Sequence, residues 1–153
     1  TNYRADVIFR TNIQTAYNVG HYKSMTSPAV KKLRPYWKYV AVDDGHTRPT
    51  HRAMNGKIFP ADHPIWNTWY PPNGFRCRCQ VVTLSERQVK ERGLKVEEEI
   101  PKVVEFQGVP FRLLPDRHFQ TNPAKGLDAQ VDISSLPDVL QRAYLRKTEK
   151  SKK

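Results

Sequence analysis

The sequence predicts a single α+β domain, with a small mixed or antiparallel sheet, an N-terminal helix, short helices and a loop rich in proline and tryptophan. Its 153 residues suffice for one ordinary domain and would crowd two. Helical periodicity marks both ends of the chain, whereas aromatic and β-branched segments bounded by turn residues fill the middle. Hydrophobic residues make up 38% of the chain and include three Trp, which supplies a core and argues against wholesale disorder.

The first predicted element is a helix from Tyr3 to about Met25. Apolar or small residues recur there at steps of three and four, the period of one helical face; the set is Ala5, Phe9, Ile13, Ala16, Tyr17 and Gly20. The pattern predicts an amphipathic helix with this set as its apolar face. After it, Ser27-Pro28 opens a basic connector that ends at Pro35, because the residue before a proline is disfavoured in a helix.

A strand and a short helix follow the connector. Residues 36–42 are aromatic and β-branched and predict a strand, which Asp43-Asp44-Gly45 ends with turn chemistry. We expect Thr47 to cap a short helix that runs through Asn55, with a proline in its first turn and a glycine just past its end. The acidic pair therefore lies at a strand end, next to this helix.

The second half of the chain alternates loops with short elements. The prolines and tryptophans of residues 57–74 predict an irregular but ordered loop that is packed by its aromatic side chains. Strand character returns over residues 75–83, and Ser85 with Gln88 forms a capping-box pattern that opens a short helix. Residues 103–114 predict a hairpin that turns at Gln107-Gly108.

The chain ends in a predicted helix, about Leu136 to Arg146, and a basic tail. Lys and Arg outnumber Asp and Glu by 26 to 15, which gives a net charge of +11 and attracts phosphate backbones. We expect the tail to contact nucleic acid through its six basic residues, Arg142, Arg146, Lys147, Lys150, Lys152 and Lys153. The alternative is that this charge run is a solvated end with no ligand.

Several classes of protein are excluded or disfavoured. No run approaches the roughly 18 consecutive apolar residues of a membrane span, and the start lacks a basic region followed by an apolar one. We therefore expect a soluble protein without a secretion signal and without a membrane partner. Cys77 and Cys79 are too close for an unstrained mutual disulfide, so a reducing compartment is the default expectation.

Cys77-Arg78-Cys79 is the strongest local indication of chemistry. Side chains two residues apart on a strand point to the same face, so both sulfurs could bind one zinc ion. His51 would be a third ligand from the short helix, and the fourth would be Asp44, His46, His63 or a water. The alternative is that both cysteines are small buried hydrophobic residues and that His51 is a hydrogen-bonded helix residue.

Asp44 and Arg48 predict a structural ion pair at the corner between strand and helix. An enzyme would instead need a metal-activated water near Asp44 and His51, acting on phosphodiester or peptide bonds. The sequence contains no His-Glu-x-x-His, Gly-x-Ser-x-Gly or phosphate-cradling glycine motif. We therefore expect no enzymatic activity, with a metal-dependent hydrolase as the alternative.

Four blocks of the chain closely resemble the phage Mu F-like minor head, or head morphogenesis, proteins. They are residues 36–44, Thr47-Arg48-Pro49-Thr50-His51, residues 55–60 and Pro71-Pro72-Asn73-Gly74-Phe75-Arg76-Cys77-Arg78-Cys79. The likeness extends back to Arg10-Thr11 and forward to Phe119-Gln120-Thr121-Asn122-Pro123. It divides the chain into a head morphogenesis domain, residues 1–135, and a C-terminal helix with a basic tail, residues 136–153.

The resemblance implies a minor capsid protein of a tailed phage or prophage that acts in head assembly near the portal. Its implied partners are the portal or major capsid protein, and double-stranded DNA without sequence specificity. The implied location is the inner capsid or portal region of the virion, and the host cytoplasm during assembly. The alternatives are a metal-dependent hydrolase or effector delivered with the phage genome, and a plain DNA-binding protein.

The resemblance also bears on the zinc site. Some branches of the family carry Cys-x-x-Cys where this chain has Arg48 to His51, and a His where it has Asn73, which with Cys-x-Cys resembles a zinc cluster. Here His51 falls on the second of those cysteines and can still bind zinc, whereas Arg48 and Asn73 are poor replacements. Three candidate ligands, His51, Cys77 and Cys79, remain.

Overall fold

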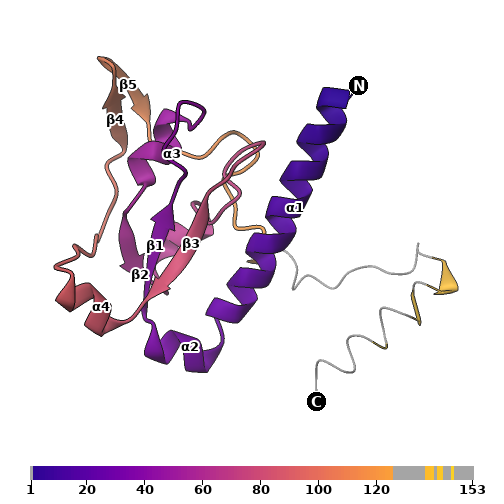
Figure 1. Ribbon diagram of the computed structural model, residues 1–153, viewed down its shortest axis with the longest axis horizontal. Helices are drawn as coiled ribbons and strands as arrows, with labels where there is room; N and C mark the ends of the chain where they lie inside the picture. The colour runs from indigo at the N-terminus through magenta and orange to yellow at the C-terminus, as the bar shows by residue number, and fades with distance from the viewer. Residues whose placement is uncertain (1, 126–136, 140, 143–145, 147–153) are drawn as a thin grey trace.

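The computed structural model describes residues 2–125, 137–139, 141–142 and 146 of the chain. A three-stranded antiparallel sheet with the strand order β2-β1-β3 forms the centre, and a separate hairpin, β4-β5, stands beside it (Figure 1). The α+β prediction is confirmed. The elements are α1 (Asn2–Met25), α2 (Pro28–Leu33), β1 (Tyr36–Val40), α3 (Pro49–Met54), β2 (Ile58–Pro60), the 3₁₀ helix η1 (Pro64–Asn67), β3 (Gln80–Leu84), α4 (Glu86–Glu91), β4 (Val103–Phe106) and β5 (Val109–Arg112).

The main core lies on one face of the sheet. Trp37 and Tyr39 of β1 alternate with half-buried residues, and they point to the same face as Phe59 of β2 and Val81 of β3. The loop that follows β2 covers this face with three fully buried rings, those of Trp66, Trp69 and Tyr70. The prediction of an ordered segment packed by its own aromatic residues over 57–74 is correct, although this range also contains β2 and η1.

The other face of the sheet packs against α4. Ile58, Leu84 and Val89 form a second, smaller cluster there. Ser85 begins α4 with a complete capping box, because its hydroxyl accepts from the Gln88 amide and the Gln88 side chain accepts from the Ser85 amide. The predicted capping box is therefore confirmed.

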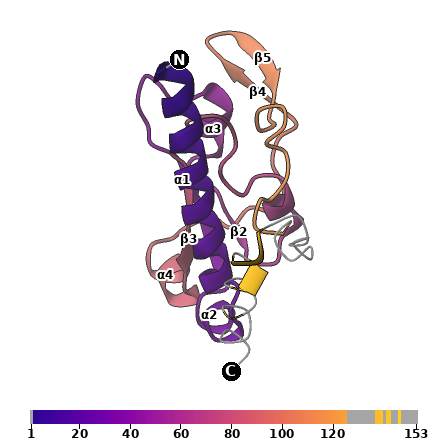
Figure 2. The same cartoon turned by 90° about the vertical axis from the view of Figure 1, so that its right-hand side faces the viewer.

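Helix α1 runs along the open edge of β3 (Figure 2). Side chains of α1 bond backbone carbonyls at this edge: Gln14 Nε2 donates to Cys79 O at 2.9 Å and His21 Nε2 to Val81 O at 2.9 Å. The hydroxyl of Tyr70 donates to the Asn18 carbonyl at 2.9 Å. The helix thus covers an edge that would otherwise expose unpaired strand groups.

The face of α1 that its apolar pattern marks is turned to solvent. The side chains of Phe9, Ile13 and Tyr17 are 66%, 56% and 53% exposed, and the buried residues of the helix are instead Thr11, Asn18, Val19 and Met25. The helix itself is as predicted, but an amphipathic helix normally buries its apolar face. Here the apolar face is exposed, and polar residues make up part of the buried side of the helix.

Three boundaries differ from prediction. Residues 28–33 form helix α2 rather than a connector, because Pro28 occupies the first turn, where its missing amide costs nothing. The short helix begins at Pro49, and Thr47 does not cap it, since the Thr47 hydroxyl donates to the carbonyl of Val42 instead. Strand β3 begins at Gln80 rather than at residue 75.

The hairpin turn at Gln107-Gly108 is confirmed, with φ of 53° and 79° at its two residues. Residues 136, 140 and 143–145 of the predicted final helix lie outside the described residues, as do Lys147, Lys150, Lys152 and Lys153. Within the part of the chain that the structure describes, no helix has the length and apolar character needed to cross a membrane.

Candidate metal centre

The structure brings His51, Cys77 and Cys79 together in the core. Nδ1 of His51 lies 3.8 Å from Cys77 Sγ and 3.5 Å from Cys79 Sγ, and all three residues are buried. The ring of His51 packs edge-on against Trp69 at 6.1 Å between centroids. Its Nε2 has no hydrogen-bond partner among the described residues, so the polar neighbours of this imidazole are the two sulfurs.

The spacing of these three atoms fits one tetrahedral zinc ion. Zn–S bonds of about 2.3 Å, Zn–N bonds of about 2.0–2.1 Å and an angle of about 109° place neighbouring nitrogen and sulfur ligands about 3.6 Å apart. The two observed separations, 3.8 Å and 3.5 Å, bracket that value. Among the described residues, this is the one group of three or more such ligands whose atoms lie within 4.8 Å of one another.

The cysteines are positioned by a loop rather than by a strand. Both precede β3, so their common direction does not come from strand alternation. The chain instead turns tightly: the Cys77 amide donates to the carbonyl of Gly74 at 3.2 Å, and the Cys79 amide donates to Cys77 Sγ at 3.5 Å. The prediction that the two sulfurs converge is correct, but the reason given for it is wrong.

The surroundings favour one thiolate at this pair. A hydrogen bond from the Cys79 thiol is the main cause that lowers the pKa of Cys77, and bonds from His51 and the Asn73 backbone N–H act in the same direction. The pKa of Cys79 is raised, chiefly because it donates that bond. Metal ligation requires deprotonated sulfur, and the lowered pKa of Cys77 acts in that direction.

Buried polar side chains that bond one another lie behind the two sulfurs. The hydroxyl of Tyr39 donates to Asn73 Oδ1 at 2.9 Å, and both side chains are fully buried. Burial, and then the neighbouring Cys79, raise the pKa of Tyr39, so this phenol stays protonated and remains a donor. Asn73 is therefore held in the core by its own hydrogen bonds.

A small hollow of about 20 Å³ opens over the three ligands. Its volume is enough for about one water molecule. Nine residues line it, and none of them is acidic: Val42, His46, Thr47, Arg48, His51, Arg76, Cys77, Arg78 and Cys79.

The predicted Asp44–Arg48 pair is not formed. Both carboxylate oxygens of Asp44 accept from Arg78 at 2.7 Å, which holds the pKa of Asp44 well below its usual range. Arg48 pairs instead with Asp116 at 3.0 Å and donates to the Phe75 carbonyl at 2.9 Å. Each partner is distant in sequence, so local spacing could not identify it. Asp44 also lies outside the group of three candidate metal ligands.

The other candidate residues are dispersed. His63 lies at the start of η1, where its two ring nitrogens bond the Ile65 amide and the Glu98 carbonyl. Arg142 and Arg146 are exposed, and the remaining predicted DNA-contact residues lie outside the described part of the chain.

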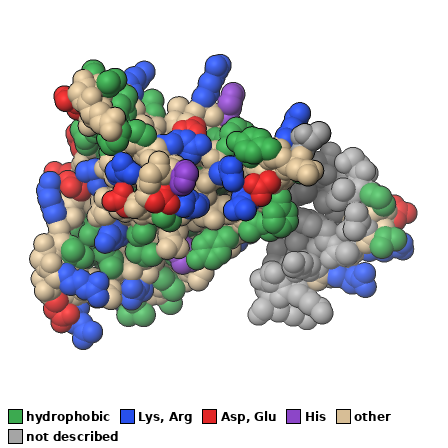
Figure 3. Space-filling model, turned by 45° about the horizontal axis from the view of Figure 1, so that its top comes forward, with side chains coloured by type: hydrophobic (Ala, Val, Ile, Leu, Met, Phe, Trp, Pro, Cys, Tyr) green, Lys and Arg blue, Asp and Glu red, His purple; other side chains and the backbone are tan. Residues whose placement is uncertain are grey.

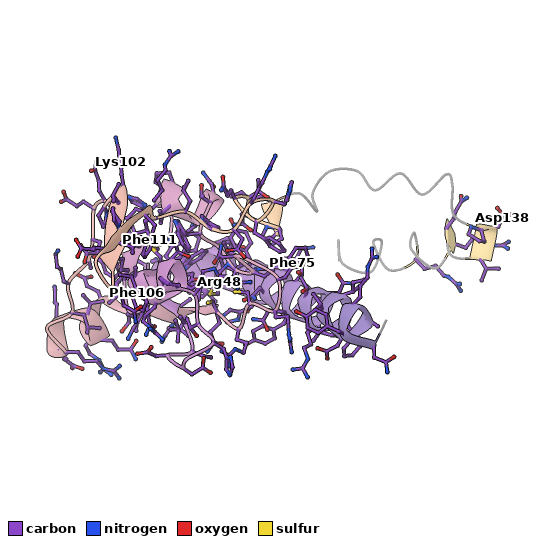
Figure 4. All side chains as sticks on the ribbon, turned by 90° about the horizontal axis from the view of Figure 1, so that it is seen from above. Arg48, Phe75, Lys102, Phe106, Phe111 and Asp138 are labelled. Atoms are coloured by element: carbon purple, nitrogen blue, oxygen red, sulfur yellow. The ribbon has the colours of Figure 1, made fainter. Side chains whose placement is uncertain are left out.

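A larger hollow was missed by sequence reasoning. It measures about 700 Å³ and lies between α1 and the loop before β3. Phe9, Ile13 and Phe75 give it apolar walls, and Arg48 reaches it from the start of α3; Figure 4 shows Arg48 and Phe75 near the side of α1. The aromatic residue Phe75, followed by Arg76 and Arg78 in the sequence, was the available signal.

Comparisons with known proteins identify the family. Residues 1–82 match the family model described as "Phage Mu protein F like protein". The chain is 50% identical over 93 residues to the "Mu-like prophage FluMu F protein" of Haemophilus influenzae, which covers 61% of this chain and 22% of that protein. It is 47% identical over 93 residues to the "Putative capsid assembly protein F" of Escherichia phage Mu, covering 61% of this chain and 21% of that protein.

The chain therefore spans about a fifth of the length of these two relatives. An uncharacterized protein of Methanocaldococcus jannaschii is 35% identical over 60 residues, or 36% of this chain and 9% of that protein. No solved structure gives a significant match. Because the family model covers more than half of the residues, the chain belongs to the phage Mu protein F like family.

Proposed function

We propose that this chain acts in head assembly of a tailed phage or prophage, as a minor capsid protein that contacts the portal or major capsid protein. Family membership supports a role in the phage head, and the name of the phage Mu relative refers to capsid assembly. The observation that carries the proposal is the outward apolar face of α1. Exposed apolar patches of this kind mark sites of protein contact.

The face is continuous with the 700 Å³ hollow. Phe9 and Ile13 belong to both, and Phe75, 55% exposed, extends the apolar surface from α1 to the neighbouring loop. Arginines 10, 48, 76 and 78 line the same hollow. Figure 3 shows hydrophobic and basic side chains side by side on the surface of the molecule. An apolar centre with a polar, charged rim is the usual composition of a protein interface.

DNA contact is the second part of the proposal. The net charge of +11 favours binding to phosphate backbones without sequence specificity. The location that follows is the inner capsid or the portal region, where such a protein meets packaged DNA. Zinc at His51, Cys77 and Cys79 would join α3 to the loop before β3.

The test removes the apolar face and keeps the fold. The double variant Phe9→Ser with Ile13→Ser is mixed with the portal and the major capsid proteins from the same phage genome, and co-purification is measured. The matched control is Val103→Ser with Val109→Ser, since these hairpin side chains are 54% and 62% exposed. We expect loss of binding in the α1 variant alone. Equal binding by both variants and the unmodified chain would refute the role of α1.

A further inference from the structure

We infer that the metal centre keeps its fourth coordination position for a small inorganic anion from solvent, so that it is an anion-binding site and not a closed structural cluster. The inference goes beyond head assembly and rests on metal binding by His51, Cys77 and Cys79. Three protein ligands with an exchangeable fourth position are typical of open zinc sites.

The described residues supply three protein ligands for the metal and no fourth. Among the described residues, His51, Cys77 and Cys79 form the group, and no fourth His, Cys, Asp or Glu lies within the same 4.8 Å reach. Asn73 is not available, because its side-chain oxygen accepts from Tyr39 and its amide nitrogen faces the carbonyls of Thr68 and Tyr70 at 3.5 Å. The fourth ligand must then come from outside this group.

The second step is the space over the ligands. The 20 Å³ hollow is bordered by all three of them and holds about one water-sized ligand. Space of this size suits a small ion such as chloride, or azide that enters end-on. It is too small to admit a segment of a partner protein.

The third step is charge. Arg48, Arg76 and Arg78 line the hollow, whereas their carboxylate partners Asp116, Asp6 and Asp44 do not. Zn²⁺ with two thiolates and a neutral imidazole carries no net charge, so a neutral metal centre faces three guanidinium groups, each of which is also ion-paired. Because the guanidinium groups border the hollow and their carboxylate partners do not, the local field favours an anion over water at the fourth position.

His46 is the competing protein ligand, because it also lines the hollow. Its imidazole lies outside the group of atoms within 4.8 Å. Its backbone is fixed in a turn in which the His46 amide donates to Asp44 Oδ1 at 3.0 Å, and Asp44 is in turn held by Arg78. The His46 ring is thus outside ligand reach in the structure, and its replacement tests whether it closes the site.

The experiment uses the full chain loaded with Co²⁺, which replaces Zn²⁺ and reports its ligands in the visible spectrum. Azide is titrated into the cobalt protein, and the d–d bands and the thiolate-to-cobalt bands are followed. We expect a saturable change in the d–d bands with the thiolate bands retained. His46→Ala should leave both the starting spectrum and the azide response unchanged.

Two arginine variants test the role of charge. Arg48→Met should weaken azide binding at least threefold, and Arg48→Lys should restore most of it. The matched control is Arg52→Met, because Arg52 lies on the same helix, pairs with Asp43 and does not line the hollow. The control should bind azide as the unmodified chain does.

A third variant closes the site. Arg48→Cys places a sulfur beside the hollow, so it should strengthen the thiolate bands and abolish the azide response. A cobalt spectrum that azide never changes, or one that His46→Ala alters, would overturn the inference while leaving the metal centre intact. Absence of any thiolate-to-cobalt band would overturn the metal centre as well. Head assembly is tested separately, through α1.

Discussion

The orientation of α1 gives a quantitative prediction, because the structure exposes the apolar face that the sequence pattern alone would bury. Phe9 and Phe59 are the same residue type in opposite environments, since Phe9 is 66% exposed and Phe59 is 0% exposed. Phe59 contacts Trp66 edge-on at 5.9 Å between ring centroids, inside the main core. Replacing each phenylalanine with alanine therefore measures which face of α1 is buried.

The expected losses of unfolding free energy differ several-fold between Phe9→Ala and Phe59→Ala. Complete burial of a large apolar side chain contributes about 1.5–3 kcal/mol, so the third of Phe9 that is covered accounts for at most about 1 kcal/mol. Phe59→Ala removes a fully buried ring and leaves a cavity, which costs about 3–5 kcal/mol. For a domain of this size each kcal/mol lowers Tm by about 3–4 °C, so the two variants should differ by roughly 10 °C.

The assay is denaturant unfolding followed by tryptophan fluorescence. Trp37, Trp66 and Trp69 are all at most 2% exposed, so their emission reports loss of the main core. The free energy of unfolding is compared among the unmodified chain, Phe9→Ala and Phe59→Ala. If Phe9→Ala costs about 3 kcal/mol or more, α1 buries its apolar face and both the described orientation and the docking surface are wrong.

Three further predictions concern the cap, an ion pair and the net charge. Ser85→Ala removes the hydroxyl that accepts from the Gln88 amide, and it should lower the free energy of unfolding by about 1 kcal/mol in a urea titration; no loss would show that the capping box is not formed. Arg78 holds the pKa of Asp44 below its usual value, so the stability from this pair is present above about pH 4 and is lost as the pH falls through the lowered pKa. Stability should thus fall more steeply in acid for the unmodified chain than for Asp44→Asn, and parallel curves would contradict the pairing. Affinity for a duplex of arbitrary sequence, measured by anisotropy, should fall at least tenfold between about 50 and about 200 mM salt; a flat response would refute electrostatic DNA contact.

The sequence predicts where helices and strands lie better than it predicts what each of them packs against. Periodicity identifies α1 because spacing alone defines a helical face, yet it does not say whether the fold or another protein covers that face. The side of α1 that does pack carries polar residues: Thr11 donates to the Val7 carbonyl at 2.7 Å and Asn18 to the Gln14 carbonyl at 3.0 Å, both within the helix. Their burial depends on contacts with distant segments, such as the Tyr70 hydroxyl that donates to the Asn18 carbonyl, and residue type alone could not reveal those contacts.

In the candidate site, too, local spacing predicts some residues and long-range contacts determine the others. Two cysteines separated by one residue and a histidine on a nearby helix were enough to predict the three residues that the structure brings together. The partners of Asp44 and Arg48 were not predictable, because they lie 34 and 68 positions away along the chain and depend on how the loops fold back. Long-range contacts of this kind follow from tertiary structure.

The central claim is that His51, Cys77 and Cys79 bind one metal ion, and its most direct test is the zinc content per chain. The chain is purified without chelators or a polyhistidine tag, and zinc is measured by elemental mass spectrometry. The account predicts close to one zinc per chain, and a large loss of zinc in His51→Ala and in Cys79→Ser. No bound zinc after incubation with excess Zn²⁺, or the same zinc content in both variants, would contradict it.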